Sequence, residues 1–345
     1  MRGHTLVTTP PRAKAPRPLS LRARLLLWFY RRIVKPSLAG PIELAAAKAV
    51  LARLDRWLGG GGAGFNREHI SAQGVACDWI GVDAAWSGRV ILYLHGGGFM
   101  FRTPRLHARL AARLCHALGA RALLPEYRLA PEYPLPAAHE DCFAAYRWLL
   151  DQGHDPANIV VIGDSAGGLL TLATLQRIRD AGLPLPACGV MFSPGTCIDS
   201  VRQLDGRAAQ GDPLIGAGAL DLLQRVVAAA VAPHDPGVSP CAGSLHGLPP
   251  LLFQAGSTEV LLHQSELAVM QAHRAGTHAE LQVWPHMPHV WQAVHWLPEA
   301  RDALACVGEF VERHSHLAGA PPAPPGNNRR GPQRDSGPQN KRNAP

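Results

Sequence analysis

Short apolar segments alternate with longer amphipathic segments through most of the chain. The short runs are typical of buried strands, and the longer periodic stretches are typical of helices with one apolar face. The predicted strands are Val75–Ile80, Arg89–Leu94, Arg121–Leu124, Asn158–Ile162, Cys188–Phe192, Pro250–Gln254 and Leu281–Trp284. The predicted helices are Leu106–Leu118, Ala137–Leu150, Ser165–Asp180, Leu262–Ala275 and Pro298–Arg313. This alternation predicts an α/β fold with a mostly parallel sheet covered by helices on both faces.

Two regions depart from the alternation. Leu21–Leu58 is helical with a break at Pro36, and one face of its first part is apolar. That face comprises Leu21, Leu25, Trp28, Phe29 and Ile33. Thr196–Gly247 also reads as helical, and we expect it to be an insertion that forms part of a lid. The predicted organisation is a disordered basic segment over residues 1–20, lid helices over 21–75, a main domain over 76–314 with the insertion at about 196–247, and a disordered tail over 315–345.

The net charge of +8 lies at the two ends of the chain. Residues 1–40 hold nine Lys and Arg and no acid, and residues 315–345 hold five Lys and Arg with one acid, which leaves the body at −5. A nucleic-acid enzyme is expected to spread its basic residues over the folded body. The charge distribution therefore argues against a nucleic-acid partner.

The seven cysteines are scattered and contain no Cys-x-x-Cys pair. Such spacing predicts neither a disulfide framework nor a zinc site, so we expect buried, reduced thiols and no metal. Near the N-terminus the longest fully apolar run is Leu25–Tyr30, which is too short for a membrane span and short for the apolar part of an export signal. We therefore expect a cytoplasmic protein.

Gly163-Asp164-Ser165-Ala166-Gly167 stands between a predicted strand and a predicted helix. In this setting Gly-x-Ser-x-Gly is a nucleophile turn, where Ser165 is backbone-strained and side chains at the two glycines would collide. The helix points its positive end at a developing oxyanion, and the Ala166 amide is placed to donate to it. Asp164 is too close in sequence to act behind a histidine, and we expect it to stabilise the turn.

His95-Gly96-Gly97-Gly98-Phe99 directly follows the strand that ends at Leu94. Consecutive glycines let main-chain amides approach a substrate oxygen with no β-carbon in the way. We expect His95 to organise this loop and not to act as a base.

A serine nucleophile needs a histidine base and a carboxylate that orients it. Glu259 follows the strand Pro250–Gln254, and the next carboxylate, Glu266, lies inside the following helix. The loop after Leu281–Trp284 offers two histidines as the base, and a third lies further along. These are His286, His289 and His295.

Taken together, the motifs resemble the hormone-sensitive-lipase-like esterases of the α/β-hydrolase fold. The resemblance covers residues 76–314 and rests on five segments: His95–Phe99, Tyr127–Glu132 with Pro136–Asp141, Gly163–Gly168, Gly247–Pro250 and Met287–His289. It implies Ser165 as nucleophile, an oxyanion hole formed by the Gly97, Gly98 and Ala166 amides, and a lid formed by the N-terminal helices and the insertion. It favours His289 as base, because the family's histidine stands two residues after a methionine. The family's acid is usually Asp, and here Glu259 occupies that place.

The resemblance further implies that Arg128, Glu132 and Asp141 pair to stabilise the loops around the site. From all of this we expect a serine carboxylesterase that hydrolyses short- to medium-chain acyl esters through a Ser-His-Glu triad, with a small ester as its partner and no cofactor.

Three other functions stay open at this point. One is a lipase that docks on lipid through the basic helix Leu21–Ile33, and another is a deacetylase of a small metabolite. The third is a binding protein that keeps the fold without the chemistry.

Overall fold

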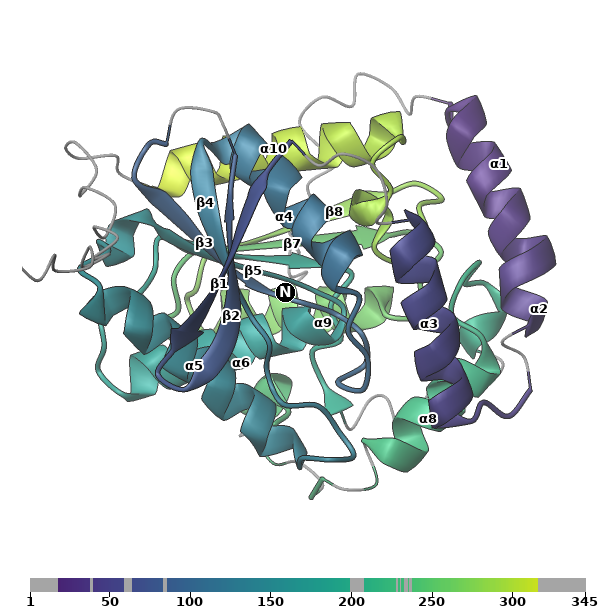
Figure 1. The fold of residues 1–345 in the computed structure, drawn as a ribbon, viewed down its shortest axis with the longest axis horizontal. Coiled ribbons are helices and arrows are strands. Elements are labelled where there is room, and N and C mark those ends of the chain that lie inside the picture. The colour runs from purple at the N-terminus through teal and green to yellow at the C-terminus, as the bar shows by residue number, and fades with distance from the viewer. Residues whose placement is uncertain are drawn as a thin grey trace, which may run out of the picture.

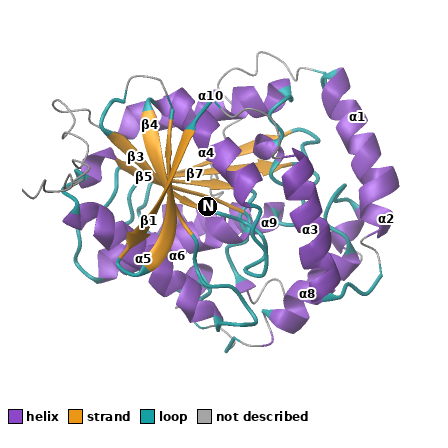
Figure 2. Ribbon diagram, viewed as in Figure 1, coloured by secondary structure: helices purple, strands orange, loops and turns teal. Residues whose placement is uncertain are grey.

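The molecule is built on a single eight-stranded sheet (Figures 1 and 2). This computed structural model describes residues 18–37, 40–58, 64–82, 86–198, 208–227 and 238–315, together with 229, 231, 232 and 235. The strands are β1 (Asn66–Ala72), β2 (Val75–Gly81), β3 (Arg89–Leu94), β4 (Ala120–Pro125), β5 (Ile159–Asp164), β6 (Cys188–Phe192), β7 (Leu251–Gly256) and β8 (Ala279–Trp284). Their order is β1-β2-β4-β3-β5-β6-β7-β8, with β2 antiparallel to β1 and β4 and the other pairs parallel. The predicted α/β class is confirmed.

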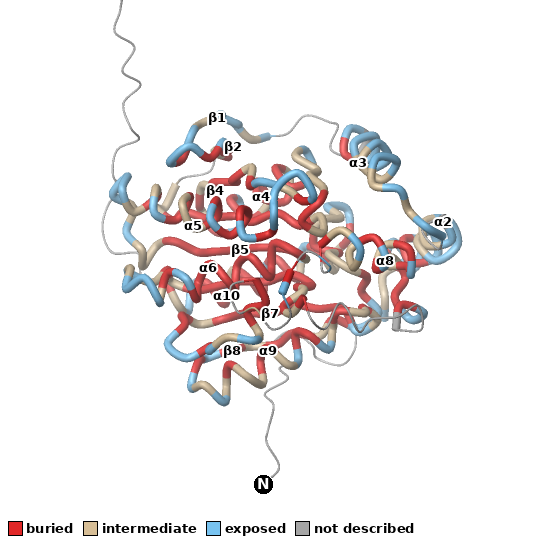
Figure 3. The backbone as a smooth tube through the Cα atoms, turned by 90° about the horizontal axis from the view of Figure 1, so that it is seen from below, coloured by how far each residue is buried: buried red, intermediate tan, exposed pale blue. Residues whose placement is uncertain are grey.

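Helices cover both faces of the sheet because every central strand is apolar on both sides. α4 (Pro104–Leu118) and α10 (Pro298–His314) share one core with alternate residues of β3, including Ile91 and Tyr93. α5 (Leu135–Asp151), α6 (Ala166–Asp180) and α9 (Leu262–Arg274) share the other core, which contains Val90 and Leu92. Figure 3 shows buried residues concentrated along β5 and α6. The predicted strands and helices of this region are confirmed, with ends that differ by a few residues.

β1 is the strand that the hydrophobic pattern does not predict. Its sequence, NREHISA, is mostly polar, and its residues are exposed except for the half-buried Ile70 and the buried Ala72. β1 lies at the edge of the sheet and pairs only with β2, so it needs no apolar face of its own.

The N-terminal helices are α1 (Leu21–Phe29), a π-helical turn (Tyr30–Val34), α2 (Lys35–Ser37) and α3 (Leu44–Leu58). The predicted apolar face of α1 is not the packed face. Leu21 and Leu25 are 73% and 68% exposed, whereas Ala23, Leu26 and Leu27 are buried. The packed side faces the segment between β8 and α10, where Ala23 and Leu26 share an apolar core with Met287 and Trp291. Ser20 also bonds to Glu299, in the first turn of α10, through both its amide and its hydroxyl, at 2.9 and 3.0 Å.

The predicted insertion at 196–247 is only partly described. It contains α8 (Ala217–Val226) and two short 3-10 turns, at Ala208–Gln210 and Pro240–Ala242. Figure 1 shows α8 beside α3 and α2, away from β1. Residues 1–17 and 316–345, where the basic end and the tail were predicted, lie outside the described residues.

Two expectations from composition can be compared with the structure. The seven cysteines all lie in the described ranges and form no disulfide, and five of them are buried. Within the described ranges, the structure contains no helix with the length and apolar character that a membrane crossing requires.

Candidate active site

Ser165 lies in the tight turn between β5 and α6. It is the residue immediately before the helix, with φ 52° and ψ −117°. This positive φ is rare for a residue with a side chain and persists only where the surrounding structure imposes it. The strand before it is fully buried, whereas Ser165 itself is partly exposed. The turn therefore presents the hydroxyl at the carboxyl edge of the sheet.

The glycines on either side of Ser165 are required by close backbone contacts. A β-carbon on Gly163 would lie 2.2 Å from the carbonyl oxygen of Gly167. One on Gly167 would lie 1.9 Å from the carbonyl oxygen of Leu94. The second contact joins the turn to the end of β3, so Gly167 also sets the distance between Ser165 and the loop that begins at His95.

His289 and Glu259 form a hydrogen-bonded chain with Ser165. Nε2 of His289 lies 2.9 Å from Oγ of Ser165, and Nδ1 lies 2.9 Å from Oε2 of Glu259. Glu259 follows β7, and His289 lies in the loop after β8. Because β5, β6, β7 and β8 are consecutive parallel neighbours, their carboxyl ends bring these three side chains to one edge of the sheet.

Glu259 is buried and fully bonded. Its side chain is 0% exposed, and Oε1 accepts hydrogen bonds from the Ser193 hydroxyl at 2.8 Å and the Gly256 amide at 2.5 Å. Burial alone would lower the pKa of His289, but the hydrogen bond and charge of Glu259, aided by Asp212 and Asp164, raise that pKa above its ordinary value. The site therefore favours a proton on His289.

The two other histidines do not reach Ser165. His286 is exposed, and its amide bonds to the Ser257 hydroxyl at 2.8 Å. His295 is also exposed, and burial together with Arg109 and Arg113 lowers its pKa. Of the three histidines left open by the sequence, the structure brings only His289 to the serine.

The glycine loop after β3 turns back beside the nucleophile turn. Gly97 and Gly98 have φ of 121° and 60°, values that favour glycine. Within the described ranges, neither of their amides donates to a protein acceptor. The Ala166 amide is at the first position of α6 and has no acceptor within the helix. These three amides are therefore available to bind an oxygen of another molecule.

Comparison with known proteins identifies the family. Residues 91–293 match the family described as alpha/beta hydrolase fold. An acetyl-hydrolase of Streptomyces hygroscopicus is 41% identical over 68% of this chain and 78% of that protein. The chain belongs to the α/β-hydrolase family.

Further relatives narrow the class. The carboxylesterase/phospholipase LipF of Mycobacterium tuberculosis is 36% identical, over 70% of each protein. The crystal structure of esterase EstE5 soaked with p-nitrophenyl butyrate is 35% identical, with a TM-score of 0.77 over 86% of this chain and 99% of that one. The same figures hold for an esterase of the bacterial hormone-sensitive lipase family. The chain is a carboxylic ester hydrolase of this hormone-sensitive-lipase-like group.

Asp164 connects the two motifs of the esterase. Its Oδ1 accepts from the Tyr93 hydroxyl at 2.6 Å and from the Gly96 amide at 3.0 Å. Burial alone would raise the pKa of Asp164, but His107, Tyr93 and His95 together lower it. The buried Asp164 carboxylate thus joins the glycine loop to the nucleophile turn. This contact extends the role expected of Asp164, which was to stabilise the turn alone.

His95 packs inside the loop of the esterase. Its ring stacks on Tyr127 at a centroid distance of 4.1 Å, and Nδ1 lies 2.7 Å from the Gly96 carbonyl oxygen. Burial, with a smaller effect of His107, lowers the pKa of His95 to about 3. A buried neutral ring with these contacts fits the loop-organising role.

Sequence reasoning missed three residues that support the esterase site. Ser193 donates to Glu259 and accepts from the Val290 amide at 3.0 Å, next to His289. Asp212 is buried and accepts from the Val260 amide at 3.0 Å. The Lys35 ammonium donates to the Asp212 carbonyl at 2.6 Å. These contacts join parts of the chain that are far apart in sequence. No local motif therefore marks the three residues.

Arg128 was expected to pair with Asp141 and Glu132, and the expectation for Glu132 is wrong. Arg128 binds Asp141, with Nη2 at 2.8 Å from Oδ1, but its second partner is Glu140 at 3.0 Å. Glu132 instead pairs with Lys48 of α3 at 2.6 Å. The reason is that Glu140 lies beside Asp141 on α5, whereas Glu132 faces the N-terminal helices.

Two clusters in the described part of the esterase could ligate a metal ion, and neither includes Ser165, His289 or Glu259. They are His278, Glu280 and His314, and His69, Asp78 and Glu126. Arginines pair with the carboxylates of both clusters. Arg313 pairs with Glu280 in the first, and Arg67 with Asp78 and Arg102 with Glu126 in the second.

Proposed function

We propose that this esterase hydrolyses short- to medium-chain acyl esters through a triad of Ser165, His289 and Glu259. The observation behind the proposal is the unbroken hydrogen-bonded chain of these three side chains, at 2.9 Å for each link. A serine, a histidine and a buried carboxylate in this order are the groups that acyl transfer requires.

The proposed reaction has two steps. Oγ of Ser165 attacks the ester carbonyl carbon while His289 Nε2 takes the hydroxyl proton, and the new negative charge on the carbonyl oxygen is bound by the amides of Gly97, Gly98 and Ala166. The alkoxide leaves with the proton from His289, and an acyl-serine remains. Water then attacks this acyl group, again through His289, and releases the acid. Glu259 orients the ring and stabilises its charged form.

The N-terminal helices and the insertion are proposed to form a lid over this site. Lys35 donates to three carbonyls of the insertion, those of Ala209, Gln210 and Asp212, at 2.6–2.8 Å. The insertion also approaches the glycine loop, because a β-carbon on Gly98 would lie 3.7 Å from Cδ1 of Leu223 in α8. α8 therefore lies against the glycine loop, where it can limit the length of the acyl chain.

Acyl-chain preference tests the substrate class. Relatives named acetyl-hydrolase and an EstE5 structure soaked with a butyrate ester support short acyl groups. With p-nitrophenyl esters from acetyl to palmitoyl, we expect kcat/KM to be highest between acetyl and hexanoyl and to fall steeply beyond octanoyl. A maximum at palmitoyl would contradict the proposal, and activity on acetyl esters alone would favour a deacetylase.

The pH dependence tests His289 as the base. A base must be neutral to accept a proton, and the pKa of His289 is raised from 6.5. We expect kcat/KM to fall as the pH is lowered, with a midpoint above 6.5, because protonated His289 cannot take the serine proton. The measurement is a pH profile of p-nitrophenyl butyrate hydrolysis at low substrate. A midpoint clearly below 6.5 would argue against the pair with Glu259.

The exposed face of α1 favours a second function, hydrolysis at an anionic lipid surface. Leu21, Leu25 and Trp28 are 73%, 68% and 59% exposed. Four exposed arginines accompany them, and the segment contains no acid. They are Arg22, Arg24, Arg31 and Arg32. Apolar side chains flanked by arginines match the chemistry of an anionic bilayer surface.

Co-sedimentation with vesicles tests this second function. We expect the esterase to pellet with phosphatidylglycerol vesicles more than with phosphatidylcholine vesicles, and Leu25→Asp with Trp28→Asp to abolish the difference. Tyr133→Ser is the matched control, because Tyr133 is also a large exposed side chain, 48% exposed, but belongs to the loop before α5 and not to α1. Equal pelleting of the wild type and the double variant would exclude α1 as the docking face.

A further inference from the structure

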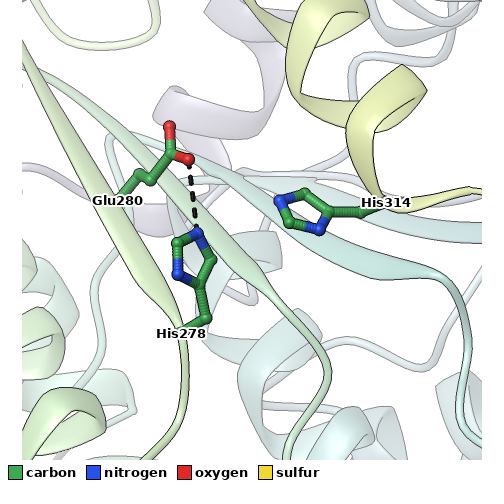
Figure 4. Close-up of side chains that lie close together, drawn as sticks. All are labelled: His278, Glu280 and His314. Carbon is green, nitrogen blue, oxygen red and sulfur yellow. Dashed lines mark hydrogen bonds and ion pairs between the residues drawn. The ribbon is translucent and has the colours of Figure 1, made fainter.

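Two histidines and a glutamate meet where the edge strand β8 begins and α10 ends. His278 precedes β8, Glu280 is its second residue, and His314 is the last residue of α10. Residues two apart on an extended strand project to the same face. One donor atom from each side chain lies within 4.8 Å of the other two. Figure 4 shows the two imidazoles facing each other, with the Glu280 carboxylate beside His278.

We propose that His278, Glu280 and His314 bind one zinc ion that joins the edge strand to the C-terminal helix. Two imidazoles and one carboxylate form a common protein ligand set for zinc, with water in the fourth position. Tetrahedral zinc with bonds of about 2.0–2.1 Å separates its ligand atoms by about 3.3 Å. His278 Nε2 and Glu280 Oε1 are already 3.3 Å apart, which is the separation that a shared zinc ion requires.

His314 has an unused donor atom directed into a buried position. Its Nε2 is buried and has no hydrogen-bond partner within the described ranges. A ring nitrogen without a protein partner is the kind of atom that can bind a metal. Phe310 packs against the ring at a centroid distance of 4.7 Å and limits its rotation.

Arg313 shares the carboxylate with the proposed ion. Its Nη1 lies 3.0 Å from Oε1 of Glu280 and its Nη2 lies 3.1 Å from Oε2. The arginine side chain is 53% exposed, so it can shift onto Oε2 and leave Oε1 to the zinc. In that position Arg313 would orient the ligating carboxylate, as outer partners of metal ligands commonly do.

The proposed ion would act on stability and not on turnover. β8 runs from Ala279 to Trp284, and the loop with His289 follows its far end. The cluster thus lies at the opposite end of the strand from Ser165. A bound ion would fasten β8, the edge strand, to α10, which covers one face of the sheet.

The test is zinc binding by the full-length protein after removal of metal with a chelator. Titration calorimetry with Zn²⁺ is expected to give one saturable site per chain, and Zn²⁺ but not Mg²⁺ is expected to raise Tm by a few degrees. His278→Ala and His314→Gln are each expected to weaken zinc binding by about 100-fold or more. Loss of a direct ligand should cost at least as much affinity as loss of a residue that only orients a ligand. Cobalt in place of zinc should give the visible spectrum of a tetrahedral site.

His263→Ala is the matched control, because His263 is an exposed histidine that pairs with a glutamate, Glu266, at 3.7 Å. It is expected to leave zinc binding unchanged. Unaltered affinity in His278→Ala, or no saturable site in the wild type, would overturn the proposal; His278 is 54% exposed, so its loss should not impair folding. Ester hydrolysis is expected to be the same in all of these variants, which keeps this result separate from that of the proposed triad.

Discussion

Ser165→Ala is expected to lower kcat for p-nitrophenyl butyrate by about 10⁴-fold or more. The hydroxyl oxygen is the atom proposed to form the acyl-enzyme, and no other side chain occupies its position 2.9 Å from His289 Nε2 among the described residues. The substitution removes one oxygen from a partly exposed residue at the start of α6, so Tm should change little. Steady-state kinetics with active-site titration would measure the loss.

A fluorophosphonate probe gives a second readout for the same variant. The wild type is expected to be labelled at Ser165 and the variant to remain unlabelled. Ser87→Ala serves as the control, because Ser87 bonds to the Gly119 carbonyl at the other end of β3 and should leave both readouts unchanged. Wild-type hydrolysis by Ser165→Ala would rule out the proposed nucleophile and would require a different one.

Glu259→Gln is expected to lower kcat by about 10³–10⁴-fold. Oε1 of Glu259 accepts from both Ser193 and Gly256, so a glutamine must place its carbonyl oxygen there. Its amide nitrogen then faces His289 Nδ1 and donates to it. The proton of the neutral ring is then fixed on Nε2. The nitrogen that faces Ser165 therefore cannot accept the serine proton. The variant also removes the negative charge that stabilises the imidazolium.

Two further variants make the Glu259 experiment decisive. Glu266→Gln neutralises an exposed carboxylate of α9 and should retain wild-type kinetics. Glu259→Asp keeps the charge and should retain part of the activity. The fall in kcat/KM at low pH should keep its midpoint in Glu259→Asp, whereas that midpoint should shift to lower pH in Glu259→Gln. Wild-type kcat in Glu259→Gln would require another acid behind His289.

Apolar content explains which parts of the fold were predictable. The central strands are apolar on both sides and are covered by helices on both faces. Their continuous apolar runs therefore stand out in the sequence. β1 is polar and exposed, and its pairing with β2 depends on backbone bonds that leave no apolar pattern. On α1 the exposed residues are the large apolar ones, so the pattern identified the helix but did not show which of its faces packs against the rest of the protein.

The predicted site residues follow from local motifs, whereas their supports do not. Ser165 and the glycines around it are fixed by a turn that the sequence shows directly. Ser193 and Asp212 reach the Glu259 segment from β6 and from the insertion, and such contacts depend on tertiary packing. The domain limits, the lid and the cytoplasmic location stay predictions.

The contact between α1 and the loop after β8 bears on how shortened forms of this protein will behave. Ala23 and Leu26 share a small apolar core with Trp284, Met287 and Trp291, the residues on either side of His289. An N-terminal deletion that extends past Leu27 would expose the back of that loop and loosen the ring that faces Ser165. A recombinant form that starts at residue 76 is therefore a poor surrogate for the enzyme, because low activity in it would reflect a displaced His289 and not the wrong substrate.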